Sequence, residues 1–131
     1  MYDEAIFAMK AKAHELGIEG AGGIVLVKEG AFTEGVVMPA LFAVGEFTRG
    51  PKNGDDGANY LAVALSKFAE MMDTNMHSGL APNRPVKKGE FGYRGGLVHF
   101  FRNGWLIKAF FSGGSAEQDC EVAIEGIKAL I

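Results

Sequence analysis

The chain has one cysteine, three histidines and no long apolar run, and each shortage excludes a class of protein. The lone Cys120 cannot form a disulfide within the chain, and we expect it to be a buried apolar thiol. An α-helix needs about twenty apolar residues to cross a bilayer, and no such run exists, so we expect no membrane partner. The first residues are amphipathic and acidic from Asp3 onward, without the basic leader of a secretion signal. These features predict a cytoplasmic protein.

Positive charge is also scarce. Lys and Arg number 13 against 16 Asp and Glu, which gives a formal net charge of −3, and the basic residues are mostly scattered singly. Nucleic-acid binding usually needs a basic patch, so we expect no nucleic-acid partner. The 131 residues show no internal repeat, so the chain is expected to be one domain spanning residues 1–131, large enough to bury its own core.

Residues 95–111 predict a β-hairpin. Asn103 and Gly104 separate two apolar runs, and this pair favours a type I′ turn, in which both central residues have positive φ. Side chains alternate across a strand, so one face is expected to cover a core and the other to be mixed. The turn predicts pairing of Phe101 with Leu106, His99 with Lys108 and Leu97 with Phe110. The expected core face holds Val98, Phe100, Arg102, Trp105, Ile107, Ala109 and Phe111, and the mixed face holds Leu97, His99, Phe101, Leu106, Lys108 and Phe110.

A helix start follows the hairpin. Ser112-Gly113-Gly114 ends the strand, Ser115 is suited to be the N-cap, and Gln118 three residues later completes a capping box. Glu117 and Asp119 place negative charge in the first turn, where the helix dipole favours it. The apolar positions recur at helical spacing and predict the buried stripe. They are Ala116, Cys120, Ala123, Ile124, Ile127, Leu130 and Ile131.

This hairpin, followed by SGGSAEQD and a short apolar helix, resembles the C-terminal signature of the GlcG/HbpS-like family. In that family a strand leads into SGG, a small or hydroxyl residue, and then EQD opening the last helix. The resemblance implies a profilin-like fold. It also implies a ligand of the haem or tetrapyrrole class, because several members bind such a ligand and assemble into oligomers. Family members carry an arginine-and-aspartate segment before the middle helix, and here Arg49 with Asp55 or Asp56 stands at that place.

The rest of the chain predicts an α+β domain: a mainly antiparallel sheet of about five strands with helices packed on it. Apolar periodicity predicts helices over 2–16 and 58–76, and strands over 24–27, 31–38 and 40–47. Residues 48–59 and 81–89 are rich in Gly, Pro, Asn and Asp and are expected to be loops. The expected buried side of the first helix holds Tyr2, Ala5, Ile6, Met9, Ala13 and Leu16, and that of the middle helix holds Leu61, Leu65, Phe68, Met72 and Met76.

Candidate site residues come mainly from the hairpin. His99 opposite Lys108 would attract a carboxylate, although the simpler explanation of His99 is a hydrogen-bonded sheet histidine. The turn Ser112-Gly113-Gly114 offers backbone N–H groups to an anion, or is only a tight turn. His77 and His14 are the candidate metal ligands; as alternatives, His77 complements a helix dipole and His14 faces solvent or another subunit. The remaining candidates for ligand binding are Phe101, Phe110, Tyr93 and Arg49.

Three functions stay open at this point. The first is an accessory protein that binds a small molecule, haem or a related tetrapyrrole by the family resemblance. The second is a small enzyme acting on a carboxylate or carbonyl compound, for which the sequence shows no acid–base pair. The third, compatible with the first, is a homo-oligomeric subunit in which a second copy covers Phe101, Leu106 and Phe110.

Overall fold

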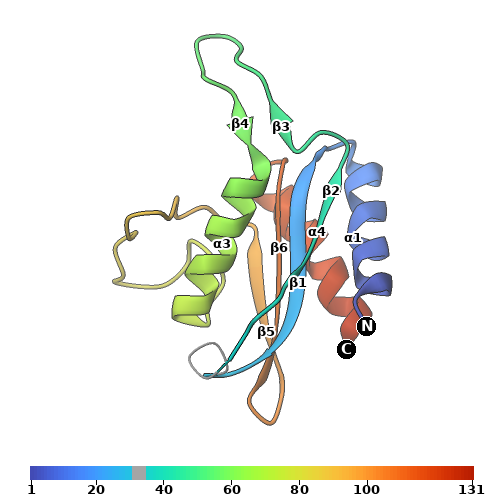
Figure 1. Ribbon diagram of the computed structural model, residues 1–131, viewed down its shortest axis with the longest axis vertical. Helices are drawn as coiled ribbons and strands as arrows, with labels where there is room; N and C mark the ends of the chain where they lie inside the picture. The colour runs from blue at the N-terminus through green and yellow to red at the C-terminus, as the bar shows by residue number, and fades with distance from the viewer. Residues whose placement is uncertain (31–34) are drawn as a thin grey trace.

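The computed structural model describes residues 1–30 and 35–131 as helices on an antiparallel sheet (Figure 1). The main sheet has four strands in the order β2-β1-β6-β5, and a second, two-stranded sheet pairs β3 with β4. This confirms the predicted α+β class and is compatible with a profilin-like fold. The elements are α1 (Asp3–Leu16), β1 (Gly20–Lys28), β2 (Ala40–Val44), β3 (Thr48–Arg49), β4 (Ala58–Asn59), α3 (Tyr60–Thr74), β5 (Gly96–Arg102), β6 (Trp105–Ser112) and α4 (Ala116–Leu130).

Helices cover both faces of the main sheet. On one face α1 and α4 pack together against β1 and β6, and on the other α3 crosses the same two strands (Figure 1). The core is therefore divided in two by the sheet. The α1/α4 side is centred on Met9, Ile24, Ile107, Phe111 and Val122. The α3 side is centred on Val25, Met71, Val98, Leu106 and Phe110.

The β6 half of the predicted mixed face does not lie at the surface of the chain. Leu106, Lys108 and Phe110 of β6 are all buried, because α3 lies over them. The expectation that a second copy covers Leu106 and Phe110 is therefore wrong: the chain covers them itself. Phe101 is half-buried and packs against the core on the α1/α4 side.

The hairpin turn is where it was predicted, but the pairing beyond it is shifted by one residue. Asn103 and Gly104 have φ of 51° and 81°, as a type I′ turn requires. A β-bulge lies between Phe100 and Arg102, so the ladder pairs Phe100 with Leu106, His99 with Ile107, Val98 with Lys108 and Leu97 with Ala109. A bulge adds one residue to one strand and reverses the faces of every residue beyond it. Hence Val98 lies on the α3 side, and His99 and Lys108 lie on opposite faces of the sheet.

The predicted helix ends are confirmed, whereas the predicted buried faces are confirmed for α1 only. Ser115 and Gln118 form the expected capping box, and Gly17 ends α1 in the left-handed conformation. The buried positions of α1 agree with the prediction, but those of α3 and α4 are rotated around the helix. On α3 they are Ala64, Ser66, Lys67, Glu70 and Met71, and on α4 they are Asp119, Val122, Ala123, Gly126 and Ile127. Leu61, Leu65, Phe68, Met72 and Cys120 are only half-buried, and Met76 and Ile124 are exposed.

Three strand and loop predictions need adjustment. β1 begins at Gly20, four residues before the expected start. Residues 35–38 are not a strand, and residues 31–34 of the same predicted strand lie outside the described part of the chain. The expected loop 48–59 carries the short strands β3 and β4 and projects from the body of the molecule (Figure 1). Residues 81–89 contain no helix or strand, as predicted.

Gly113 is expected to tolerate no side chain. Its φ is 154°, and a Cβ there would collide with the backbone of Glu19 and would lie 2.9 Å from Gly20 Cα. Gly113→Ala should lower the free energy of unfolding by about 2–4 kcal/mol, from overpacking and backbone strain together. Urea unfolding measures this change. Gly50→Ala is the control, since nothing lies within 4 Å of a Cβ there; its effect should stay within about 0.5 kcal/mol. Equal effects of the two changes would contradict the prediction.

Candidate functional site

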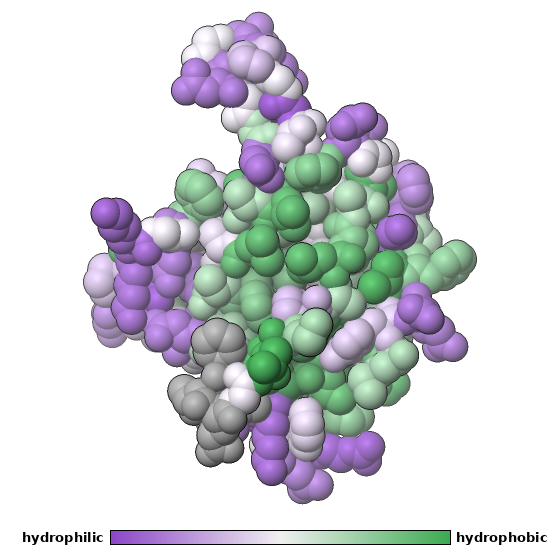
Figure 2. Space-filling view, in the orientation of Figure 1, coloured by the Kyte–Doolittle hydropathy of each residue, from purple (hydrophilic) through white to green (hydrophobic). Residues whose placement is uncertain are grey.

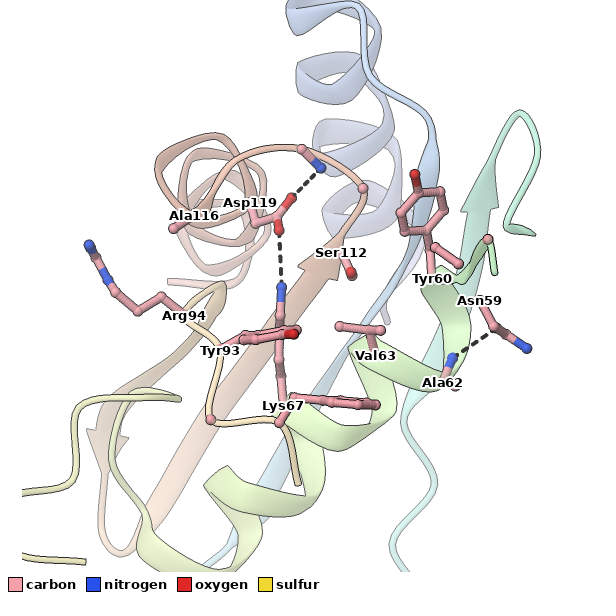
Figure 3. Close-up of a pocket in the computed structure, with 16 residues that line it drawn as sticks. Asn59, Tyr60, Ala62, Val63, Lys67, Tyr93, Arg94, Ser112, Ala116 and Asp119 are labelled. Carbon is pink, nitrogen blue, oxygen red and sulfur yellow. Dashed lines mark hydrogen bonds and ion pairs between the residues drawn. The ribbon is translucent and has the colours of Figure 1, made fainter. Parts of the chain in front are cut away.

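A cavity of ≈700 Å³ lies where the start of α3 meets the turn between β6 and α4 (Figure 3). The base of the β3–β4 hairpin, the segment 91–94 and the first residues of α4 complete its wall. Its volume is within the range of pockets that hold small molecules and cofactors, roughly 300–1,000 Å³. We take this cavity as the candidate site.

A buried ion pair closes the inner end of the cavity. Lys67 on α3 donates to Asp119 Oδ2 at 3.0 Å and to the backbone carbonyl of Phe111 at 2.7 Å. Lys67 and Asp119 are 2% and 3% exposed, and both line the cavity. The other carboxylate oxygen, Asp119 Oδ1, accepts the Gly114 N–H at 2.8 Å. The pair therefore joins α3, the end of β6 and the start of α4 at one point (Figure 3).

Burial acts on the two charges in opposite directions. It lowers the pKa of the Lys67 ammonium and raises that of the Asp119 carboxyl, and the attraction between the two groups opposes both shifts. The cause is the loss of hydration, which disfavours the charged form of each group. Two titratable groups with opposite shifts in one cavity form an arrangement that proton-transfer sites use, although structural ion pairs show it as well.

The turn after β6 is mostly satisfied by its own side chains. Besides the Gly114 bond, the Ser115 N–H donates to Gln118 Oε1, and the Gln118 N–H donates to Ser115 Oγ. These donors are engaged, so the turn does not offer them to an anion. Ser112 differs: it lines the cavity and is 5% exposed, and its hydroxyl has no hydrogen bond to any residue in 1–30 or 35–131. That hydroxyl is available to a ligand.

Aromatic groups and one cation form the outer part of the cavity. Phe91 and Tyr93 stack with ring centroids 5.4 Å apart, and both are exposed. Tyr60 contributes a third ring from the first turn of α3. Arg94 is exposed and points away from the Lys67–Asp119 pair (Figure 3), and within the described residues it has no ion pair. The cavity thus has a polar inner end, aromatic walls and a positive charge at its mouth.

Four of the predicted site residues are brought together here: Tyr93, Ser112, Gly113 and Gly114. Arg49 lies in a neighbouring hollow of ≈460 Å³ that shares Tyr60 and Gly113 with the main cavity. Its guanidinium holds both carboxylate oxygens of Asp55 at 2.9 and 3.2 Å. This contact raises the pKa of Arg49 and lowers that of Asp55. Asp55, and not Asp56, is therefore the partner of Arg49.

The hairpin candidates lie elsewhere. Lys108 lines a different cavity, and His99, on the other face of the sheet, lines neither that cavity nor the main one. Phe110 is fully buried and stacks on Phe68 with centroids 5.1 Å apart, so it packs the core. Phe101 lies under the guanidinium of Arg102, 4.7 Å from its ring centroid.

The histidines are dispersed. His14 is exposed on α1, as expected. His77 follows α3, and its Nδ1 accepts the Val98 N–H at 3.0 Å, which anchors it to the edge of the sheet. Neither of them, nor His99, lines the main cavity. Within residues 1–30 and 35–131, no group of three or more His, Cys, Asp or Glu residues could hold a metal ion.

Sequence reasoning missed Lys67 and assigned Asp119 only to the helix dipole. Lys67 lies at the spacing of Ala64 and Met71 on the inner face of α3, yet the stripe of larger apolar residues pointed to another face. A lysine in the middle of a mostly apolar helical segment was the available signal, because a long side chain can carry its charge to a partner. Tyr60, Val63 and Phe91 carried no signal that distinguishes them from ordinary core residues.

Comparison with known proteins adds one finding. No protein-family model and no curated protein match the chain. The crystal structure of a PduOC:heme complex has a similar fold, with a TM-score of 0.65, over 96% of this chain and 88% of that one. The sequences are 17% identical, so the likeness shows the fold alone. It is consistent with the expected GlcG/HbpS-like fold. In addition, no helix in the described part of this chain has the length and apolar character needed to cross a membrane.

Proposed function

We propose that this protein is a ligand-binding accessory protein that holds haem or a related tetrapyrrole in the cavity between α3 and the β6–α4 turn. The observation that carries the proposal is the fold shared with a PduOC:heme complex over 96% of the chain. The ≈700 Å³ cavity supplies a site of suitable size for a large cofactor or part of one. Bound haem would supply an iron centre for ligand binding or electron transfer.

The chemistry of the cavity fits this class of ligand. A tetrapyrrole is a flat apolar ring with carboxylates at one edge. Tyr93 and Phe91, whose rings stack on each other, line the cavity, and the Arg94 charge at the mouth is placed to meet carboxylates. Iron in haem proteins is held by His, Cys, Met or Tyr, and Tyr60 and Tyr93 are the cavity residues of these types. His77, His14 and His99 remain candidates for ligation from a second copy of the chain.

The proposal includes a homo-oligomer. Figure 2 shows a hydrophobic area on the face that carries α3 and β2. Leu41 of β2 is 46% exposed and lies on the face opposite buried Phe42, and Leu61 and Leu65 of α3 are half-buried. Exposed apolar surface of this kind commonly marks a contact between subunits. In this proposal the area takes the place of Leu106 and Phe110, which the chain itself buries.

Titration of the purified apo-protein with haemin, followed by absorbance, tests the function. We expect a saturable Soret shift. Tyr93→Phe should change the spectrum and weaken binding at least tenfold if Tyr93 holds the iron, since a lost direct ligand costs more than about 1.4 kcal/mol. Arg94→Gln should weaken binding more modestly, because an exposed ion pair contributes roughly 0–1 kcal/mol.

Three control variants distinguish iron ligation by a cavity residue from ligation by a histidine. His14→Ala, His77→Ala and His99→Ala should leave the Soret band in place if the iron is held from the cavity. Loss of the band in one of them would assign that histidine as an axial ligand and contradict the expectation that the cavity alone holds the iron. Absence of a saturable shift in the wild-type protein would contradict haem binding altogether.

A second function, a small enzyme acting on a carboxylate or carbonyl compound, is favoured by one observation. Lys67 and Asp119 face one cavity with pKa values shifted in opposite directions, next to the free hydroxyl of Ser112. Such a pair can exchange a proton with a bound substrate. The measurement is turnover of a panel of small carbonyl compounds by the wild-type protein and by Ser112→Ala, which keeps the ion pair. Equal turnover by the wild-type protein and Ser112→Ala would show that the Ser112 hydroxyl takes no part in the reaction, which would contradict this cavity as the active site.

A further inference from the structure

Lys108 lies in a second cavity, at the other end of α3 from the candidate site. It projects from β6 toward α3, and only 2% of its surface is exposed. The cavity is ≈360 Å³ and has apolar walls that include Val27, Ala69 and Leu106. Lys108 lines this cavity and is otherwise enclosed by the described residues, so the cavity is the side from which a small molecule would approach its amine.

The partners of the Lys108 amine among the described residues are neutral. Nζ donates to Asn75 Oδ1 at 2.8 Å and lies 3.4 Å from Met72 Sδ. No carboxylate oxygen in residues 1–30 or 35–131 lies within 4.0 Å of it. Lys67 is equally buried but has Asp119 at 3.0 Å. Among residues 1–30 and 35–131, Lys108 is therefore a buried lysine without the ion pair that usually accompanies one.

This environment favours the uncharged amine. Burial lowers the pKa of Lys108 to about 8, and attraction to Glu29 opposes the shift only in part. Near pH 7.5 about a quarter of such amines are neutral, against about 0.1% for a lysine with the ordinary value of about 10.4. A neutral amine is a nucleophile, and desolvated lysines of this kind form Schiff bases in enzymes.

We propose that Lys108 binds a small aldehyde or ketone covalently in this cavity, as an imine. The amine nitrogen adds to the carbonyl carbon to give a carbinolamine. Both amine hydrogens leave with the carbonyl oxygen as water, and a C=N bond forms, so no oxidant or reductant is needed. Asn75 Oδ1 accepts one N–H hydrogen and orients the nitrogen for attack.

The cavity wall narrows the class of carbonyl compound. Val27, Ala69 and Leu106 form apolar walls that suit a short alkyl chain. Glu29 and Asp73 line the same cavity, and Asp73 is already paired with Arg84 at 2.8 Å and with Lys87 at 3.0 Å. Apart from Lys108 itself, Lys28 is the other charged residue of the wall. Since two of the three charged residues around Lys108 are acidic, a neutral aldehyde should enter more readily than a keto acid.

The test uses propionaldehyde with cyanoborohydride, which reduces an imine to a stable secondary amine. The folded wild-type protein is treated near pH 7.5, digested, and its modified lysines are quantified by mass spectrometry. We expect Lys108 to be modified at least about tenfold faster than exposed Lys52 and Lys128, given its larger neutral fraction. Glyoxylate, which carries a carboxylate, should modify Lys108 more slowly than propionaldehyde does.

Two internal controls keep the test decisive without any variant. Lys67 is as buried as Lys108 but ion-paired, so it should stay unmodified. In denaturant, Lys108 should be modified at the same rate as Lys52, because the cavity no longer exists. If Lys108 in the folded protein reacts no faster than Lys52, the proposal is wrong. The result is independent of haem binding, which concerns the other cavity.

Discussion

Replacing Lys67 with methionine is expected to lower the free energy of unfolding by about 3–5 kcal/mol at neutral pH. The change removes one member of a buried pair and leaves Asp119, which is 3% exposed, without its cation. It also removes the donor to the Phe111 carbonyl at the end of β6. Urea unfolding followed by circular dichroism measures the loss. The same change in an exposed pair, Lys128→Met opposite Glu125, is the control and should cost at most about 0.5 kcal/mol.

The decrease in the free energy of unfolding caused by Lys67→Met should depend on pH. The direction of this dependence follows from the titration of Asp119. Burial already raises the pKa of this carboxyl, and loss of the lysine raises it further. A raised pKa in the folded state means that the folded protein holds a proton which the unfolded chain releases, so stability falls as pH rises through that range. The loss should therefore be smaller near pH 5 than near pH 8. The double variant Lys67→Met/Asp119→Asn should lose less unfolding free energy than Lys67→Met alone, and its loss should not vary with pH. If the double variant loses as much as the single variant, the charge of Asp119 is not the cause.

Alkaline pH is expected to stabilise the wild-type protein relative to Lys108→Met. The folded-state pKa of Lys108 is lowered from 10.5 to about 8, so between these values the unfolded chain holds the extra proton. The free energy of unfolding therefore rises with pH across this window. At about 1.4 kcal/mol per unit, the rise that depends on Lys108 amounts to about 3 kcal/mol. Methionine is similar in length and uncharged, so the variant should fold and lack this rise.

The measurement is the difference in unfolding free energy between wild type and Lys108→Met at pH 7 and at about pH 10. Taking the difference removes the other groups that titrate in this range. Lys128→Met, which removes an exposed lysine, should follow the wild type across the range. A difference that stays constant with pH would mean that Lys108 titrates alike in the folded and unfolded states.

Features decided within four or five residues were predictable from the sequence. The Asn103-Gly104 turn, the Ser115–Gln118 capping box and the end of α1 at Gly17 are where the local patterns placed them. Each depends on the backbone preference of one residue or on a hydrogen bond across one helical turn. The order of helices and strands followed from the same local signals and from apolar periodicity.

The bulge in β5 could not be predicted from the local sequence. The turn alone predicted that His99 faces Lys108, but one extra residue between Phe100 and Arg102 places them on opposite faces. Nothing in the alternation of apolar and polar residues marks that position, since both faces of β5 carry apolar side chains. Because of that one residue, His99 and Lys108 do not form the predicted pair.

Composition, local turns, caps and the α+β order were determined by the sequence itself, because they depend on neighbours along the chain. Only the tertiary structure decided that α3 covers the second face of β6, which buries Lys108 and Phe110 there. It likewise decided that Lys67 meets Asp119, 52 residues away, at the inner end of the main cavity. The physical reason is the same in both cases. Burial and charge pairing depend on which elements pack together. An amphipathic pattern predicts that one face of a helix or strand is covered, but it does not predict which element covers that face.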